Sequence, residues 1–206
     1  MDLSENIKLS GHDFIWINKS EVNKSGDTIS ILATAESDFF NSPVQENGMF
    51  PRPIANASIL LTEFEGDFIF KVKVKPVFKT FADAAAVMIY ENENVWAKFA
   101  YEKSDMPGEL PAIVTVVTNR ISDDANAITL DQEFVHLQVS RVGDTFAFHY
   151  SLDNETYVMA RLFTLPVGKS VWVGLEAQAP LGEAKYHEFS ELEISSRSIE
   201  NIRKGV

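Results

Sequence analysis

The sequence predicts an all-β protein in which two antiparallel sheets pack face to face. Apolar and polar residues alternate in about a dozen short segments, turn residues separate these segments, and no helical period persists for more than about two turns. Hydrophobic residues make up 45% of the 206 positions, enough for one large core, and sandwiches of about 200 residues often stay undivided. We therefore expect a single domain over residues 1–206, with its core at about 13–195 and a polar C-terminal tail.

The strands expected in the first half of the chain lie between residues 14 and 90. The clearest is 67–75, where Phe68, Phe70, Val72 and Val74 alternate with lysines and should face the core. Other strands are expected at 14–17, 28–34, 58–62 and 84–90, although the alanines within 80–86 would tolerate a helix. Residues 41–53 should form a long loop, and long loops in compact domains are often functional.

The second half begins with a central pair of strands between residues 94 and 121, joined by a turn at 105–108. A loop is expected at 122–127. Turns at 141–144 and 151–154 then separate further strands. These strands are expected at 134–140, 145–150, 156–163, 171–179 and 186–195.

Charge and composition exclude several classes of partner. Thirty acidic against 18 basic residues give a net charge of −12, which disfavours binding to nucleic acid or to anionic membrane surfaces. Cysteine is absent, so the chain has no disulfide framework and no thiolate site. The first residues show no secretory pattern, and no apolar run approaches the ~18 residues of a membrane helix. A cytoplasmic location is expected.

The segment 95–102 carries the main candidate site. Its odd-numbered residues form an apolar face, whereas Trp96, Lys98 and Glu102 lie on the other face. An aromatic surface beside hydrogen-bonding charges suits a sugar or small polar ligand, and this reading requires the three side chains to be partly exposed. A solvated sheet face with an ion pair and a half-buried Trp is the alternative. The full candidate ligand-binding set is Phe39, Trp96, Lys98, Glu102, Thr118, Trp172, Glu176 and Gln178.

No metal or cofactor site is expected. The four histidines do not have the spacing of a zinc site. Asp123 and Asp124 could supply oxygen ligands to calcium, but two adjacent aspartates more often form a turn.

Four ordered motifs carry a resemblance to a known family. They are Trp-x-Lys-x-x-x-Glu at 96–102, Val-Val-Thr with a following Ser-Asp within 116–123, Ser-x-Asp at 151–153 and Val-Gly-Leu-x-Ala-x-x-Pro at 173–180. Together they resemble a family of unknown function (domain of unknown function 1349) whose named member is the regulation-of-enolase protein. This family belongs to the concanavalin A-like lectin/glucanase superfamily, so the resemblance implies a jelly-roll sandwich with a concave sheet. Asn154 stands where the family tends to have Gly, and Phe40 and Tyr157 stand where it often has Trp.

The resemblance implies no established activity. Glucanases of the superfamily share a Glu-x-Asp-x-x-Glu strand; here Glu36 and Asp38 begin the pattern, but Asn41 occupies its last position. The sequence therefore favours a non-catalytic module that binds a carbohydrate or sugar-like metabolite. Two alternatives stay open: a regulatory protein-interaction domain acting on a metabolic enzyme, and a glycoside hydrolase that uses Glu102 with Glu176.

Overall fold

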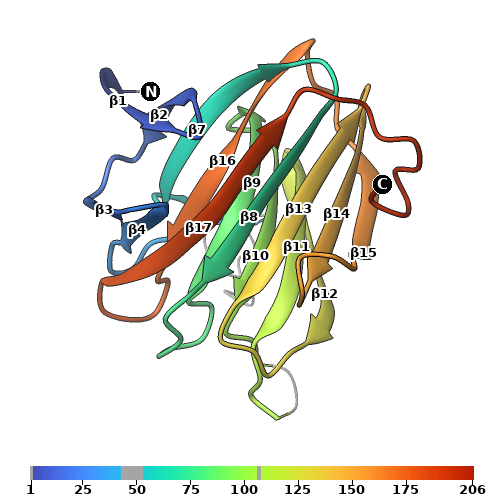
Figure 1. The fold of residues 1–206 in the computed structure, drawn as a ribbon. Coiled ribbons are helices and arrows are strands. Elements are labelled where there is room, and N and C mark those ends of the chain that lie inside the picture. The colour runs from blue at the N-terminus through green and yellow to red at the C-terminus, as the bar shows by residue number, and fades with distance from the viewer. Residues whose placement is uncertain (1, 43–52, 106–107) are drawn as a thin grey trace.

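Two antiparallel sheets pack face to face in the computed structural model, as Figure 1 shows. The structure describes residues 2–42, 53–105 and 108–206, and these residues contain strands and turns but no helix. The predicted two-sheet antiparallel sandwich is therefore confirmed. None of the described residues belongs to a helix long and apolar enough to cross a membrane. The cytoplasmic location stays a prediction.

The sheet that carries the candidate site has eight strands. Four of them, β16, β9, β10 and β11, lie side by side between β7 and the edge strand β12, and every neighbouring pair is antiparallel. In spatial order the strands are β1 (Asp2–Leu9), β2 (His12–Ile17), β7 (Ser58–Glu65), β16 (Ser170–Gln178), β9 (Ala84–Asn92), β10 (Val95–Glu102), β11 (Ala112–Asn119) and β12 (Ile121–Thr129).

The opposite sheet has seven strands. In spatial order they are β15 (Val158–Thr164), β14 (Thr145–Ser151), β13 (Val135–Val142), β8 (Phe68–Lys75), β17 (Lys185–Ser195), β4 (Thr28–Ala33) and β3 (Val22–Ser25). A separate two-stranded pair joins β5 (Phe39–Phe40) to β6 (Ile54–Ala55).

The main core lies between the two large sheets. The apolar residues expected to face inward on β8, from Phe68 to Val74, are all buried there, because alternate side chains of a strand point to one face. Phe99 of the eight-stranded sheet stacks on Phe148 of the seven-stranded sheet, with ring centroids 4.6 Å apart. This contact joins the inner faces of the two sheets.

A second apolar cluster lies on the outer face of the eight-stranded sheet. It includes Phe39, Met88 and Trp96, and it is covered by residues 37–42 and 54–57, which we call the cap. The cap is tied to the sheet at both ends. The backbones of Ser37 and Ala179 bond each other, and the backbone oxygen of Asn41 accepts a hydrogen bond from the backbone N–H of Ser122.

Several segments differ from expectation or lie partly outside the described residues. The loop predicted at 122–127 is wrong, because these residues belong to edge strand β12. Strands β1 and β3 were not anticipated. The expected loop at 41–53 and turn at 105–108 include residues 43–52 and 106–107, which lie outside the described part of the chain.

The C-terminal residues lie against the outer face of the seven-stranded sheet, beside β14 (Figure 1). The backbone oxygens of Arg203 and Gly205 bond the side chains of His149 and Gln138, respectively, and Ile199 is buried. The segment expected to be a polar tail is therefore packed onto the sandwich.

Candidate functional site

A cavity of about 560 Å³ opens on the outer face of the eight-stranded sheet, next to the cap. Its floor is formed by β10, β11 and β16, one wall by β12, and the opposite rim by the cap and the loop between β8 and β9. We call it the outer-face pocket. It is lined by Asp38, Phe40, Phe81, Ala82, Lys98, Glu102, Val114, Val116, Ile121, Ser122, Asp124 and Gln178.

Small side chains on the sheet leave room for this pocket. Ala84 of β9 lies between Glu102 and Gln178, its partners on the neighbouring strands, and Ala86 lies between Ala100 and Glu176. Toward the other end of the same strands, large aromatic rings occupy the outer face and pack under the cap. The sheet surface is therefore filled at one end and hollow at the other, because side-chain volume changes along the strands.

Lys98 is the buried polar centre of the pocket floor, with 2% of its surface exposed. Its ammonium donates to Asp38 Oδ1 at 3.1 Å, to the backbone oxygen of Phe39 at 3.1 Å and to Gln178 Oε1 at 2.5 Å. An ammonium has three N–H donors, so these partners satisfy all of them. Lys98 thereby joins the cap to strand β16.

Gln178 extends this network to the loop between β8 and β9. Its side-chain nitrogen donates to the backbone oxygen of Ala82 at 2.8 Å and approaches Glu102 Oε2 at 3.5 Å. Ala82 has a φ of 65°, an unfavourable conformation for a residue with a Cβ. Two backbone hydrogen bonds with Lys103 hold this conformation: the N–H of Ala82 donates to the oxygen of Lys103, and the N–H of Lys103 donates to the oxygen of Asp83. The rim next to Phe81 is thus fixed by the same residue that contacts Lys98.

A buried ion pair supports that rim from below. Asp83 and Lys185 are 0% and 6% exposed, and Lys185 Nζ lies 2.5 Å from Asp83 Oδ1. Asp83 also accepts hydrogen bonds from the backbone of Lys79 and Thr80. Burial alone would raise the pKa of Asp83, but these hydrogen bonds outweigh it and lower the pKa.

The carboxyl groups at the floor are strongly perturbed. Burial raises the pKa of Glu102 to about 8 and that of Glu176 to about 7, while attraction to Lys98 opposes both shifts. Burial also disfavours the charge of Lys98, but the surrounding carboxylates, Asp38 first, raise its pKa above the ordinary value. The floor therefore retains one permanent cation beside two carboxyl groups that hold protons near neutral pH.

Strand β12 adds a carboxylate from the sheet edge. Asp124 pairs with Val116 and faces the pocket, whereas its neighbour Asp123 pairs with Val117 and turns the other way, to Arg161 at 3.0 Å. The side chain of Asp124 is exposed, but partial loss of hydration next to the sheet raises its pKa. The two adjacent aspartates thus lie on opposite faces of a strand instead of forming a turn.

The structure brings three of the predicted site residues to the pocket lining: Lys98, Glu102 and Gln178. Glu176 is fully buried next to them but does not line the cavity. The remaining four lie elsewhere. Phe39 and Trp96 pack edge-to-face in the second apolar cluster, Thr118 bonds Ser122, and Trp172 lies against that cluster away from the cavity.

The expected partial exposure of Trp96 and Lys98 is wrong. Both side chains lie on the predicted face of β10, but Trp96 is 0% exposed because the cap, through Phe39, covers it. A buried indole offers no surface to a ligand. The aromatic groups that do line the pocket are Phe40 and Phe81, and Phe81 is 45% exposed.

Sequence reasoning missed Phe81, Ile121 and Asp124 as lining residues. The signal for Phe81 was weak, because it lies in a turn whose only local pattern is a run of helix-tolerant alanines. Ile121 and Asp124 lie in β12, which has no alternating pattern. Asp38 and Phe40 were noted only in the comparison with family motifs, and their distance from Lys98 along the chain gave no sign of contact.

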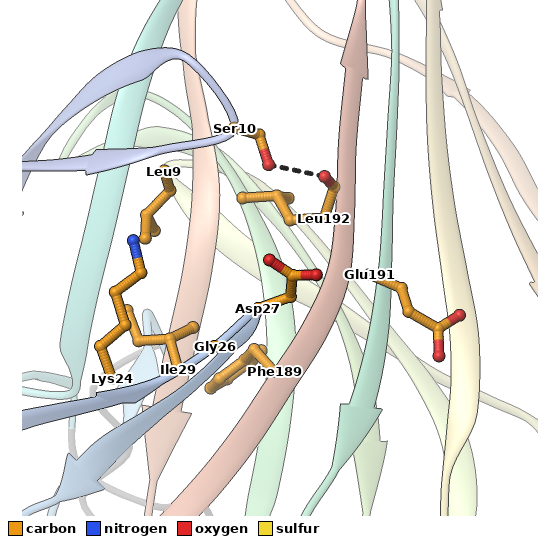
Figure 2. A pocket seen from close by; sticks show the side chains of 9 residues that line it. All are labelled: Leu9, Ser10, Lys24, Gly26, Asp27, Ile29, Phe189, Glu191 and Leu192. Carbon is orange, nitrogen blue, oxygen red and sulfur yellow. Dashed lines mark hydrogen bonds between the residues drawn. The ribbon is translucent and has the colours of Figure 1, made fainter.

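A second, smaller hollow of about 310 Å³ lies at another edge of the sandwich, between the β1–β2 turn, the β3–β4 hairpin and β17. Figure 2 shows its floor of Leu9, Ile29 and Phe189, with Ser10 bonding the backbone oxygen of Leu192. Glu191 points away from this hollow and instead bonds Lys73 and His136. The other charged side chains that line this hollow, Lys24 and Asp27, are exposed. It lacks the buried charged network of the outer-face pocket.

Metal binding finds no support in the described part of the chain. Within it, no three or more histidine, aspartate or glutamate side chains are grouped so that they could hold an ion. The carboxylates of the outer-face pocket are thus spread around a cavity and do not converge on one point.

Solved structures with the same fold include proteins of different kinds. A functionally unknown protein from Saccharomyces cerevisiae is 22% identical, with a TM-score of 0.80, over 89% of this chain and 96% of that one. A carbohydrate binding module from Bacillus subtilis is 12% identical, with a TM-score of 0.55, over 88% and 95%. A xylan β-1,4-xylosidase from Bacillus halodurans is 9% identical, with a TM-score of 0.63, but the match covers only 39% of that enzyme.

At these identities the comparisons show a shared fold. Among curated proteins no significant match was found. A family model, described as "Protein of unknown function (DUF1349)", matches residues 16–197, which is most of the chain and contains the whole outer-face pocket. The chain therefore belongs to the DUF1349 family, as the sequence motifs indicated.

Proposed function

We propose that this protein is a non-catalytic binding module that takes a carbohydrate or a similar polyol in the outer-face pocket. The observation that carries the proposal is an exposed aromatic ring, Phe81, next to a buried polar floor centred on Lys98. Sugars need this combination, because their C–H faces pack on aromatic rings while their hydroxyls bond polar groups.

The size of the pocket and the internal hydrogen bonds of its walls support the same proposal. Its volume of about 560 Å³ is within the range of about 300–1,000 Å³ that is usual for small-molecule sites. The bonds from Lys98 and Gln178 hold the cap and the Ala82 rim in place without a ligand. Such pre-organisation lowers the entropy cost of binding. Fold similarity to a carbohydrate binding module agrees with this proposal.

The test is a glycan array followed by calorimetry on the glycan that binds best. We expect Phe81→Ala to weaken binding by about tenfold or more, since an aromatic platform contributes on the order of 1 kcal/mol beyond its buried area. The matched control is Leu152→Ala, because Leu152 is 48% exposed, similar to Phe81, but lies outside the pocket. Equal binding by both variants would place the ligand elsewhere.

A second candidate function, glycoside hydrolysis, is favoured by one specific observation. Glu102 lines the pocket and holds a proton near neutral pH, as a general acid must. Its proposed partner Glu176 does not line the cavity, so the second carboxylate would have to be Asp38 or Asp124. Turnover of any chromogenic glycoside that is lost in Glu102→Gln would establish this function in place of simple binding.

A further inference from the structure

The nitrogen donors among the described side chains that line the outer-face pocket are engaged within the protein. The three N–H groups of Lys98 and the side-chain nitrogen of Gln178 have the partners described above. The hydroxyl of Ser122 lies 2.8 Å from that of Thr118 and also accepts a bond from the backbone of Asn41. A ligand that needs donors from these side chains would have to break existing bonds.

The acceptors are in the opposite situation. Asp38 uses one oxygen, Oδ1, for Lys98 and for the backbone of Phe39, and its Oδ2 has no partner among the described residues. Glu102 has only the 3.5 Å approach of Gln178. Asp124 receives a hydrogen bond from the backbone of Ala125 and otherwise faces the cavity. The atoms left for a ligand are therefore carboxyl oxygens.

The charge of the lining also disfavours an anionic ligand. Three carboxyl groups, those of Asp38, Glu102 and Asp124, face the cavity with one ammonium whose donors are already used. Below them the buried Glu176 adds a fourth carboxyl group, neither of whose oxygens has a hydrogen-bond partner among the described residues. An anionic ligand would meet the carboxylates of Asp38 and Asp124 at short range, and the N–H donors of the neighbouring ammonium are already used.

We propose that the ligand of this pocket is a sugar or polyol bearing an ammonium group, in preference to a neutral, acidic or phosphorylated one. This inference rests on the proposed carbohydrate-binding function and names the class of sugar. The ammonium supplies N–H donors to the carboxyl oxygens that have no partner and a positive charge that offsets the carboxylates of Asp38 and Asp124. Its neighbouring C–H groups pack on Phe40 and Phe81, whose ring faces also attract cations.

An organic cation fits this cavity better than a metal ion. The carboxylates are not grouped closely enough in the described residues to coordinate one ion, and apolar side chains such as Val114 and Ile121 separate them. Metal ions need several oxygens at about 2.0–2.6 Å, whereas an ammonium can bond one or two carboxylates and leave the rest of the ligand against apolar walls.

The experiment compares three sugars that differ at one carbon: 6-amino-6-deoxyglucose, glucose and glucuronate. Each is titrated into the full chain at pH 8 while amide shifts of the pocket residues are followed by NMR. We expect the aminated sugar to bind at least about tenfold more tightly than glucose, glucuronate to bind most weakly, and the advantage of the amine to shrink as salt is added.

Two neighbouring aspartates give a matched pair of variants. Asp124→Asn removes a carboxylate that faces the pocket, whereas Asp123→Asn removes the adjacent carboxylate from the opposite face of the strand. Both change the net charge equally. We expect only Asp124→Asn to lower the affinity for the aminated sugar by about fivefold to tenfold, with glucose binding unchanged. Equal losses in both variants would reduce the effect to general charge attraction and overturn the inference.

The outcomes separate this inference from the function on which it rests. Glucose or glucuronate binding as tightly as the aminated sugar overturns the preference for ammonium and leaves the carbohydrate-binding function standing. If none of the three sugars binds, the inference is overturned as well. If an array of neutral, acidic and aminated oligosaccharides then also shows no binding, the carbohydrate-binding function itself is wrong.

Discussion

At the scale of single residues, Glu176 is the most unusual side chain of the site. It is fully buried, and neither carboxyl oxygen has a hydrogen-bond partner among the described residues. An ionised carboxylate in such surroundings loses its hydration without replacement, which is why burial raises the pKa of Glu176 to about 7. The fold favours the neutral acid.

Replacement of Glu176 should change how stability depends on pH. The pKa of this group is higher in the folded state than the ordinary 4.5, so its contribution is fully present below about pH 4.5 and is lost as pH rises through 7. The loss is on the order of 3 kcal/mol. In urea unfolding at pH 5 to 8, Glu176→Gln should flatten this decline, because an amide of similar size carries no charge.

Glu63→Gln on β7 is the control, since Glu63 is exposed. A decline as steep in Glu176→Gln as in the parent protein would contradict the assignment and move the pH dependence to other groups, Glu102 first.

At the scale of elements, the loop between β8 and β9 depends on the buried pair Asp83–Lys185. Asp83→Asn would leave the Lys185 ammonium in the interior without its counter-charge, and breaking a buried pair typically costs about 3–5 kcal/mol. We expect a loss of unfolding free energy in this range. Because the pair supports the Ala82 rim, sugar binding should weaken in the same variant.

A double-mutant cycle checks this prediction. The variant Asp83→Asn/Lys185→Met replaces both charges and should be clearly more stable than the sum of the two single losses implies. Additive losses would show that the two side chains act independently, and the ion pair would then have no role in holding the rim.

Elements also show where sequence reasoning succeeds and fails. Alternation identified β8, β10, β13 and β16, and it placed the inner faces of β8 and β10 correctly, because one face of each strand packs on the core. Edge strand β12 escaped detection because all but two of its residues, Ser122 and Thr129, are exposed, so the core imposes no alternation on its sequence. As a result, the pocket wall that carries Asp124 was not predicted either.

At the scale of the whole molecule, the sequence predicted the architecture more fully than the candidate site. Strand periodicity assigned Trp96 and Lys98 to one face of the sheet. It could not show that Phe39, 57 residues before Trp96, would cover that face. Which residues of a face remain exposed depends on contacts between segments far apart in the chain, and a single sequence does not encode these locally.

The apolar cluster under the cap has a consequence for how the molecule opens. Strands β9 and β10 are buried on both faces from Ala84 to Ile89 and from Trp96 to Tyr101, whereas short strands and a few hydrogen bonds hold the cap. Local opening free energies follow such differences in contact density. The cap should therefore detach as a unit of its own while the sandwich stays closed, and each such event would bring Trp96 into water.

Hydrogen exchange followed by mass spectrometry should show amides of residues 37–42 and 54–57 exchanging many times faster than those of β9 and β10. A ligand seated against Asp38 and Phe40 should slow the exchange of the cap alone. If the cap exchanged as slowly as β9, it would instead be part of the global folding unit. Otherwise one wall of the outer-face pocket opens and closes independently of the sandwich, and Trp96 becomes exposed to water each time it opens.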